Sequence, residues 1–401
     1  MKKILGLIMA FTLIAVLVTG CTEKSSTTST TSTPTNTTTK TTSTTTNATI
    51  TPTSATTTTT EQNRTVTVTD MSGDTVTITG QVKRIVNLWP AGTSSFFVIG
   101  AGDLIVGLAS NTTGTMNSWT QLFYPNCINI PAVGGTSPTV ESLLKLNPDL
   151  VIIHPTTAAS GFAKQIRDAG VPAININFTD YKTMAQAYTI LGQILGGEYQ
   201  KKLQTWCSTT DAKLAKVRNL TANIPDAQRP VVYYIAGQSD SLTTTMTGNS
   251  IFQDWTESAG GAYAARLMGL TSGTVTPEAV FKLDPDIIIC GGVYQHVEIN
   301  ALKTTNGWKD LKAVKSGRVY NNPYANFNWE RFGLESQFQI YYALMCIQPE
   351  IAQLNGINRE SMIQDIIDFY VTYTDVVLTR AQAANMLDGL RPDGSTEIPV
   401  K

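Results

Sequence analysis

Residues 139–153 read TVESLLKLNPDLVII, and residues 276–289 read TPEAVFKLDPDIII. The two segments align without a gap and place Glu141 and Glu278 at the same point, 137 positions apart (278 minus 141). Each copy predicts a short helix with a glutamate in its first turn, where a carboxylate suits the positive end of the helix dipole. A Pro-Asp turn then leads into an apolar run typical of a buried parallel strand. Two copies of this unit predict two similar βα lobes.

Short apolar runs alternate with amphipathic stretches on both sides of each copy. This alternation predicts an α/β fold, in which each of two lobes is built on a parallel sheet. Period-two runs at 65–69 and 75–79 predict a hairpin before the first lobe. The other predicted strands are residues 84–88, 150–153 and 173–176 in the first half and 230–235, 287–289 and 318–320 in the second half.

A helical region over residues 182–220 separates the two halves and is interrupted only at Gly196-Gly197. Its second piece, from Glu198, would extend roughly 35 Å at 1.5 Å per residue, enough to join two small lobes. An ordinary long surface helix fits the same pattern. The expected organisation is a signal peptide (1–20), a tether (21–62), an N-terminal lobe (63–181), the connecting helices (182–220) and a C-terminal lobe (221–401).

The amino terminus carries the features of an export signal. Lys2 and Lys3 precede an apolar run that ends in Val18-Thr19-Gly20-Cys21, and the run is short for a membrane span. Its last four residues resemble a lipobox, which implies lipidation of Cys21; an uncleaved membrane anchor is the alternative. The Thr- and Ser-rich tether cannot bury enough apolar surface to order itself. We therefore expect an extracytoplasmic protein anchored to the outer face of the membrane.

Composition excludes several function classes. The formal net charge of the 401-residue chain is −1, which argues against nucleic-acid binding because phosphate contacts need a basic surface. Cys127, Cys207, Cys290 and Cys346 form no CxxC pair, and either one disulfide or four free thiols fits their spacing. Two histidines cannot build a zinc cage, and no catalytic or nucleotide-binding motif is present. The chain is thus expected to be a binder with no intrinsic cofactor or metal, and not an enzyme.

The repeated unit resembles the helical-backbone (class III) periplasmic binding proteins of ABC importers. That resemblance implies uptake of a small molecule, most often a metal chelate. The first expected ligand is an iron-siderophore, the second is cobalamin or haem, and the third is an oxyanion. A surface enzyme or adhesin on the same scaffold is the alternative from a different class. Further matching stretches are 69–73 (TDMSG), 83–86 (KRIV), 259–261 (AGG) and 308–320 (WKDLKAVKSGRVY).

The resemblance also implies partners. In this family a helix-borne glutamate of each lobe docks onto arginines of the permease dimer, which works with its ATPase, and the matching positions are Glu141 and Glu278. The alternative for both residues is a simple interaction with the helix dipole, worth about 0.3–1 kcal/mol.

Ligands of two-lobed βα proteins bind beyond the carboxyl ends of the parallel strands. Arg331 follows an aromatic stretch where relatives carry Trp and then Arg-Pro, but here Glu330 intervenes and the proline is absent. Arg331 therefore either clamps an anionic group of the ligand or pairs with Glu330 or Glu335. His154 either ligates a metal of the bound complex or is a hydrogen-bonded rim residue. The expected ligand-binding residues are Trp89, Asn111, Thr136, His154, Tyr234, Tyr294, Trp329 and Arg331.

Overall fold

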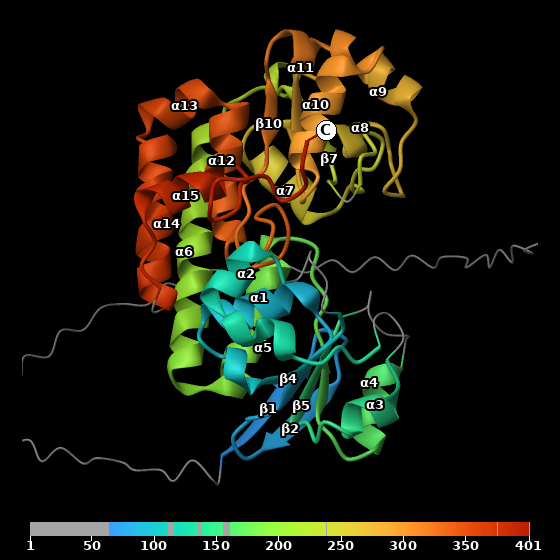
Figure 1. Cartoon of the computed structure of the whole chain (residues 1–401), viewed down its shortest axis with the longest axis vertical. Coiled ribbons are helices and arrows are strands. Elements are labelled where there is room, and N and C mark those ends of the chain that lie inside the picture. The colour runs from blue at the N-terminus through green and yellow to red at the C-terminus, as the bar shows by residue number, and fades with distance from the viewer. Residues whose placement is uncertain are drawn as a thin grey trace, which may run out of the picture. The chain divides into compact units, whose positions relative to one another are not determined.

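A computed structural model describes residues 64–110, 116–134, 138–154, 161–237, 239–374 and 376–400 (Figure 1). The export signal, Cys21 and the tether lie outside the described residues, as do Asn111 and Thr136. Within the described part, no helix is long and apolar enough to cross a membrane. Cys127, Cys207, Cys290 and Cys346 are free thiols, so the expectation that left a disulfide open resolves to four unpaired cysteines.

Two four-stranded parallel sheets form the cores of the lobes, which confirms the predicted fold class. The strand orders are β4-β3-β5-β6 and β8-β7-β9-β10, so both sheets place the second strand of the lobe at one edge, next to the first. A separate antiparallel hairpin pairs β1 (Thr65–Thr69) with β2 (Thr75–Thr79). The strands are β3 Ile85–Asn87, β4 Ile105–Leu108, β5 Leu150–Ile153 and β6 Ala173–Asn175 in the N-terminal lobe, and β7 Val231–Ile235, β8 Ala262–Tyr263, β9 Ile287–Cys290 and β10 Val319–Asn321 in the C-terminal lobe.

The sequence repeat is also a structural repeat. Helix α3 (Val140–Leu144) leads to β5, and α9 (Pro277–Leu283) leads to β9, each helix capped by a threonine side chain. Asn147 and Asp284 hold the matching turns with positive φ values of 44° and 46°. Such values are tolerated by Asn and Asp better than by most residues, which explains these residue types at the turn.

The aspartate of each Pro-Asp turn fixes a neighbouring strand. The Asp149 carboxylate accepts a hydrogen bond from the Lys83 backbone N at 2.8 Å, and the Asp286 carboxylate accepts one from the Val231 backbone N at 2.8 Å. These two backbone groups lie at or just before the starts of β3 and β7. The aspartate of the repeated motif therefore holds the neighbouring strand in position in both lobes.

The connecting region consists of α5 (Tyr181–Leu195) and α6 (Gly197–Thr221), which confirms the predicted break at the Gly196-Gly197 pair. Both glycines adopt positive φ, at 69° and 53°, a conformation that costs other residues more. In Figure 1, α6 extends past the N-terminal lobe towards the C-terminal lobe.

The C-terminal helices lie beside α6 and contact both lobes, an arrangement that the sequence pattern did not predict. Helix α12 packs on α6, and the Trp206 indole N donates to the Leu334 carbonyl at 2.6 Å. Tyr370 of α14 stacks on Phe123 of the N-terminal lobe, with the two ring centroids 4.7 Å apart. The helices are α1 Pro90–Val98, α2 Ser118–Phe123, α4 Phe162–Asp168, α7 Ile251–Ser258, α8 Ala264–Leu267, α10 Gln295–Thr304, α11 Lys312–Lys315, α12 Ser336–Ile347, α13 Pro349–Leu354, α14 Arg359–Tyr373 and α15 Arg380–Leu387.

Candidate ligand-binding site

A buried polar network lies at the carboxyl ends of the C-terminal strands, with Glu330 at its centre. The Glu330 carboxylate accepts hydrogen bonds from the Tyr234 hydroxyl at 2.9 Å, the Gly292 backbone N at 3.3 Å and the Asn322 side-chain amide at 2.8 Å. Arg331 donates from Nε to the same carboxylate at 3.2 Å. Glu330 is fully buried, and these four donors offset the cost of removing its charge from water.

The Arg331 guanidinium is held inside the protein. Its side chain is 15% exposed, and besides Glu330 it bonds the Ala236 carbonyl at 2.8 Å. Of the roles left open by the sequence, the structure thus shows the pairing with Glu330. The Glu335 carboxylate has other partners, since it accepts from the Phe327 backbone N at 3.0 Å and from the Tyr370 hydroxyl.

Glycines allow the ends of β7 and β9 to approach closely enough to form this network. A Cβ atom on Gly291 would lie 2.3 Å from the Tyr234 hydroxyl oxygen, and one on Gly237 would lie 1.4 Å from the Gly291 carbonyl oxygen. Both distances are far below van der Waals contact, so no larger residue fits without backbone movement. Gly292 is equally confined, since a Cβ atom on it would lie 2.3 Å from the Gly237 carbonyl oxygen.

A second carboxyl group, that of Glu298, is buried without a hydrogen-bond partner. Glu298 lies in the first turn of α10, and neither carboxyl oxygen has a hydrogen bond of normal geometry, although the nearby Gly237 backbone favours the charged form slightly. Burial, the largest cause, raises the pKa of Glu298 to about 9. Glu298 is therefore mostly protonated at neutral pH, and sequence reasoning gave no sign of it.

The N-terminal lobe has a smaller, uncharged network at the equivalent edge. Asn87, the last residue of β3, is buried and donates to the Trp89 carbonyl and to the Thr93 hydroxyl, both at 2.8 Å. The Trp89 backbone N donates back to the Asn87 side chain at 3.2 Å. This arrangement fixes the turn from β3 into α1.

His154, which follows β5, is partly exposed, and burial lowers its pKa to about 4, so the ring is neutral at neutral pH.

Three of the four aromatic residues expected to face a ligand are buried against protein. The ring centroids of Trp89 and Phe178 are 5.0 Å apart, and those of Trp329 and Phe338 are 4.9 Å apart. The Tyr234 hydroxyl donates a hydrogen bond to Glu330, and all three aromatic residues are buried. Tyr294 alone among these four is partly exposed. The expected aromatic lining is therefore not open to solvent in this conformation. Direct ligand contact by Trp89, Tyr234 and Trp329 requires movement of their neighbours and stays a prediction.

Glu141 and Glu278 both lie exposed in the first turns of their helices, one in each lobe. The Glu141 side chain is 81% exposed and pairs with Lys145 of the next turn at 3.0 Å. Pairs of this exposed type contribute little to stability. Both carboxylates are thus accessible to a partner.

The profile of a family described as "Periplasmic binding protein" matches residues 85–324, more than half of the chain. The chain belongs to this family. Among its relatives is an "uncharacterized ABC transporter substrate-binding lipoprotein", YvrC of Bacillus subtilis, 29% identical over 63% of this chain and 76% of its own length. A solved periplasmic solute-binding protein from Veillonella parvula is 25% identical, with a TM-score of 0.69, and the match covers 81% of this chain and 97% of that one.

Two relatives have ligands in their names. A "cobalamin-binding protein" of Halobacterium salinarum is 26% identical over 55% of this chain, which covers 57% of the length of that relative. A "Fe(3+)-citrate-binding protein", YfmC of Bacillus subtilis, is 27% identical over 67% of this chain and 81% of its own length. The chain is thus a periplasmic binding protein of the ABC transporter type, and such proteins work with a permease and an ATPase.

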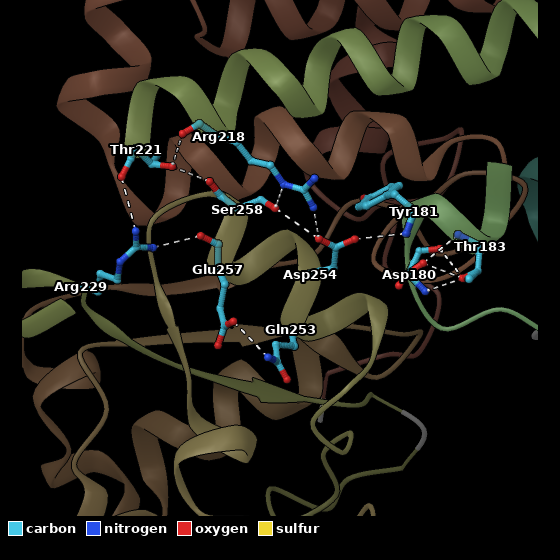
Figure 2. A network of polar contacts seen from close by, with 10 residues as sticks. All are labelled: Asp180, Tyr181, Thr183, Arg218, Thr221, Arg229, Gln253, Asp254, Glu257 and Ser258. Carbon is cyan, nitrogen blue, oxygen red and sulfur yellow. Dashed lines mark hydrogen bonds and ion pairs between the residues drawn. The ribbon is translucent and has the colours of Figure 1, made fainter. Parts of the chain in front are cut away.

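A polar hollow of about 580 Å³ lies elsewhere in this periplasmic binding protein, among the ends of α5, α6 and α7 (Figure 2). Asp254 is its central residue, because its carboxylate accepts from the Arg218 guanidinium at 2.6 Å and from the Tyr181 backbone N at 3.2 Å. Arg229 donates to the Glu257 carbonyl at 3.1 Å. These contacts join the connecting helices to the C-terminal lobe, and we interpret the hollow as a structural joint.

Proposed function

We propose that this chain is the lipid-anchored solute-binding protein of an ABC importer, and that it carries a metal chelate between the carboxyl edges of its two sheets. The chelate is an iron-siderophore or a corrinoid. Support for a chelate comes from the relatives named for cobalamin and ferric citrate. Among the described residues, no group of three or more His, Cys, Asp and Glu side chains is placed to hold a bare metal ion.

The observation that carries the transport role is the pair of exposed glutamates on the repeated α-β unit. Glu141 and Glu278 begin α3 and α9, whose sequences and turns match across the two lobes. Two carboxylates related in this way fit a permease dimer with two equivalent subunits. In this proposal each glutamate docks onto one subunit, and Cys21 carries the lipid that keeps the protein at the membrane.

Charge reversal tests the docking step. In cells with the cognate permease, the double variant Glu141→Lys/Glu278→Lys should lose uptake of the chelate and keep its binding affinity. Glu198→Lys on α6 is the matched control, because Glu198 is also an exposed first-turn glutamate paired with a lysine. Normal uptake by the double variant would exclude docking through these residues. Recovery of a Cys21→Ser variant in the membrane fraction would exclude the lipid anchor.

A further inference from the structure

The segment that follows α15 contacts both lobes. The Leu390 carbonyl accepts a hydrogen bond at 2.9 Å from the indole N–H of Trp119, which lies on α2 of the N-terminal lobe. The preceding carbonyl, that of Gly389, accepts one at 2.9 Å from Nε2 of His296, which lies on α10 of the C-terminal lobe. Figure 1 shows the chain running from α15 to the C-terminal lobe. Two consecutive peptide groups of this segment thus bond to opposite lobes.

Glu397 joins the lobes a second time. A turn, closed by a hydrogen bond from the Arg391 backbone N to the Ser395 carbonyl at 2.8 Å, precedes it. One carboxylate oxygen of Glu397 accepts hydrogen bonds from the Ser118 hydroxyl at 3.1 Å and from the Tyr324 hydroxyl at 2.9 Å. Ser118 is the first residue of α2, and Tyr324 lies beyond β10. A single oxygen atom therefore holds one residue of each lobe.

All of these partners belong to connections that leave the carboxyl ends of strands. Ser118 and Trp119 lie on the first helix after β4. His296 follows β9 and Tyr324 follows β10. In folds of this type, ligands bind beyond the carboxyl ends of the parallel strands. The segment after α15 therefore links the two edges between which we place the ligand.

The two lobes also bond to each other directly at the adjacent residues. The Asn117 side-chain amide donates to the Ala325 carbonyl at 2.8 Å, and the Thr120 hydroxyl donates to the Asn326 carbonyl at 3.2 Å. All four residues are buried. Moving α2 away from the C-terminal lobe would break these bonds together with those to the segment after α15.

The position of Gly389 is fixed by a close approach to the C-terminal edge. Its φ value is 62°, and a Cβ atom on it would lie 2.4 Å from the amide oxygen of Gln295. The buried Gln295 side chain donates to the Gly292 carbonyl at 3.0 Å and accepts from the Asn322 backbone N at 2.8 Å. The Asn322 side chain in turn donates to Glu330. The segment thus packs on the polar network of the C-terminal edge.

We propose that residues 389–397 form a clasp that holds the carboxyl edges of the two lobes together, and that the clasp has to release α2 before a ligand can enter or leave. Its bonds to α2 come from a hydroxyl and an indole N–H, and such hydrogen bonds are modest in net strength, so the clasp can open reversibly. The inference rests on the proposed function, because only a ligand held between the edges requires the clasp to open.

The first test needs no ligand. In the full-length chain, Glu397→Ala removes both bonds of the carboxylate, and a second variant that stops after Leu390 removes the rest of the clasp. Hydrogen exchange followed by mass spectrometry should show peptides of α2 and of residues 324–327 exchanging at least tenfold faster than in the wild type, while peptides of β5 keep their rate. The matched control is Glu360→Ala, because this exposed carboxylate joins α14 to α15 through Arg380. Unchanged exchange of α2 in the Glu397→Ala variant would overturn the clasp.

The second test measures ligand exchange, with cyanocobalamin and ferrichrome as probes and stopped-flow tryptophan fluorescence as the readout. Glu397→Ala should raise the dissociation rate of a bound probe at least fivefold, and Glu360→Ala should leave it unchanged. Ser118→Ala should also raise this rate. Because Glu397→Ala already removes the bond to Ser118, the double variant should release the probe no faster than Glu397→Ala alone.

The outcomes separate the clasp from the proposed function. Faster exchange of α2 with an unchanged dissociation rate would overturn the control of ligand passage. Failure of both probes to bind the wild type would count against a chelate as the ligand, and the hydrogen-exchange result would then decide on the clasp alone.

Discussion

The two lobes share a fold and a repeated motif but differ in how they stabilise their ligand-facing edges. The N-terminal lobe uses a neutral network around Asn87, whereas the C-terminal lobe buries the Glu330–Arg331 pair and a lone carboxyl group, Glu298. The strand order is the same in both, so the sheet does not dictate the chemistry of its edge. The difference teaches that the same strand order can be combined with a buried ion pair at one edge and with a neutral hydrogen-bond network at the other.

The largest expected effect comes from removing the centre of the charged network. Glu330→Ala leaves Arg331, Tyr234 and Asn322 without their shared acceptor, and it should lower the free energy of unfolding by about 3–5 kcal/mol. Urea unfolding followed by circular dichroism measures this loss. A change below about 1 kcal/mol would show that the pair is not a stabilising element of the C-terminal edge.

The next effect concerns Glu298 and depends on pH. Its folded-state pKa, raised by burial to about 9, lies above the unfolded value of about 4.5, so the unfolded state loses its proton first as pH rises. The stability present below pH 4.5 is therefore lost progressively up to pH 9, at a rate of at most about 1.4 kcal/mol per pH unit.

Glu298→Gln removes this titration while keeping the shape of the side chain. The variant should be more stable than the wild type at pH 8, and its advantage should shrink towards pH 5. Thermal melts at pH 5, 6, 7 and 8 measure the difference. An advantage that is constant over this range would mean that Glu298 titrates normally and is solvated in the folded protein.

The smallest effect is expected in the N-terminal lobe. Asn87→Ala removes neutral hydrogen bonds to the Thr93 hydroxyl and to the Trp89 backbone N and carbonyl, of which the carbonyl keeps its bond from the Thr93 backbone N, at a cost of about 1–3 kcal/mol. The loss should be smaller than that of Glu330→Ala in the same urea experiment. If Asn87→Ala lowered the free energy of unfolding as much as Glu330→Ala or more, the charged network would not be the stronger of the two stabilising elements.

The fold could be predicted from the sequence because several local signals within the repeat favour the same structure. The Thr cap, the first-turn glutamate, the Pro-Asp turn and the apolar run each favour one local conformation, and all of them occur twice. The break between α5 and α6 could be predicted from Gly196-Gly197 for the same reason. Local signals that agree with one another are sufficient for the architecture.

The site was less predictable because it depends on contacts between distant segments. The Glu330 network joins residues from β7, the loop after β9 and the segment after β10, and no local pattern links these three. Trp89 and Trp329 follow strand ends as expected, whereas Tyr234 lies within β7. All three are buried by packing that no local pattern predicts, such as that of Trp89 on Tyr188 of α5 and of Trp329 on Phe338 of α12. Asn111 and Thr136 lie outside the described residues, and their ligand contacts stay predictions.

The central claim is that a metal chelate binds between the carboxyl edges of the two sheets. Anomalous scattering from crystals grown with a ferric siderophore or a corrinoid locates the metal directly. The account predicts one strong peak next to the loops that follow β5, β7 and β9, near His154 and Tyr294. A peak in the hollow around Arg218 and Asp254, or no bound metal under conditions that saturate the crystals, would contradict it.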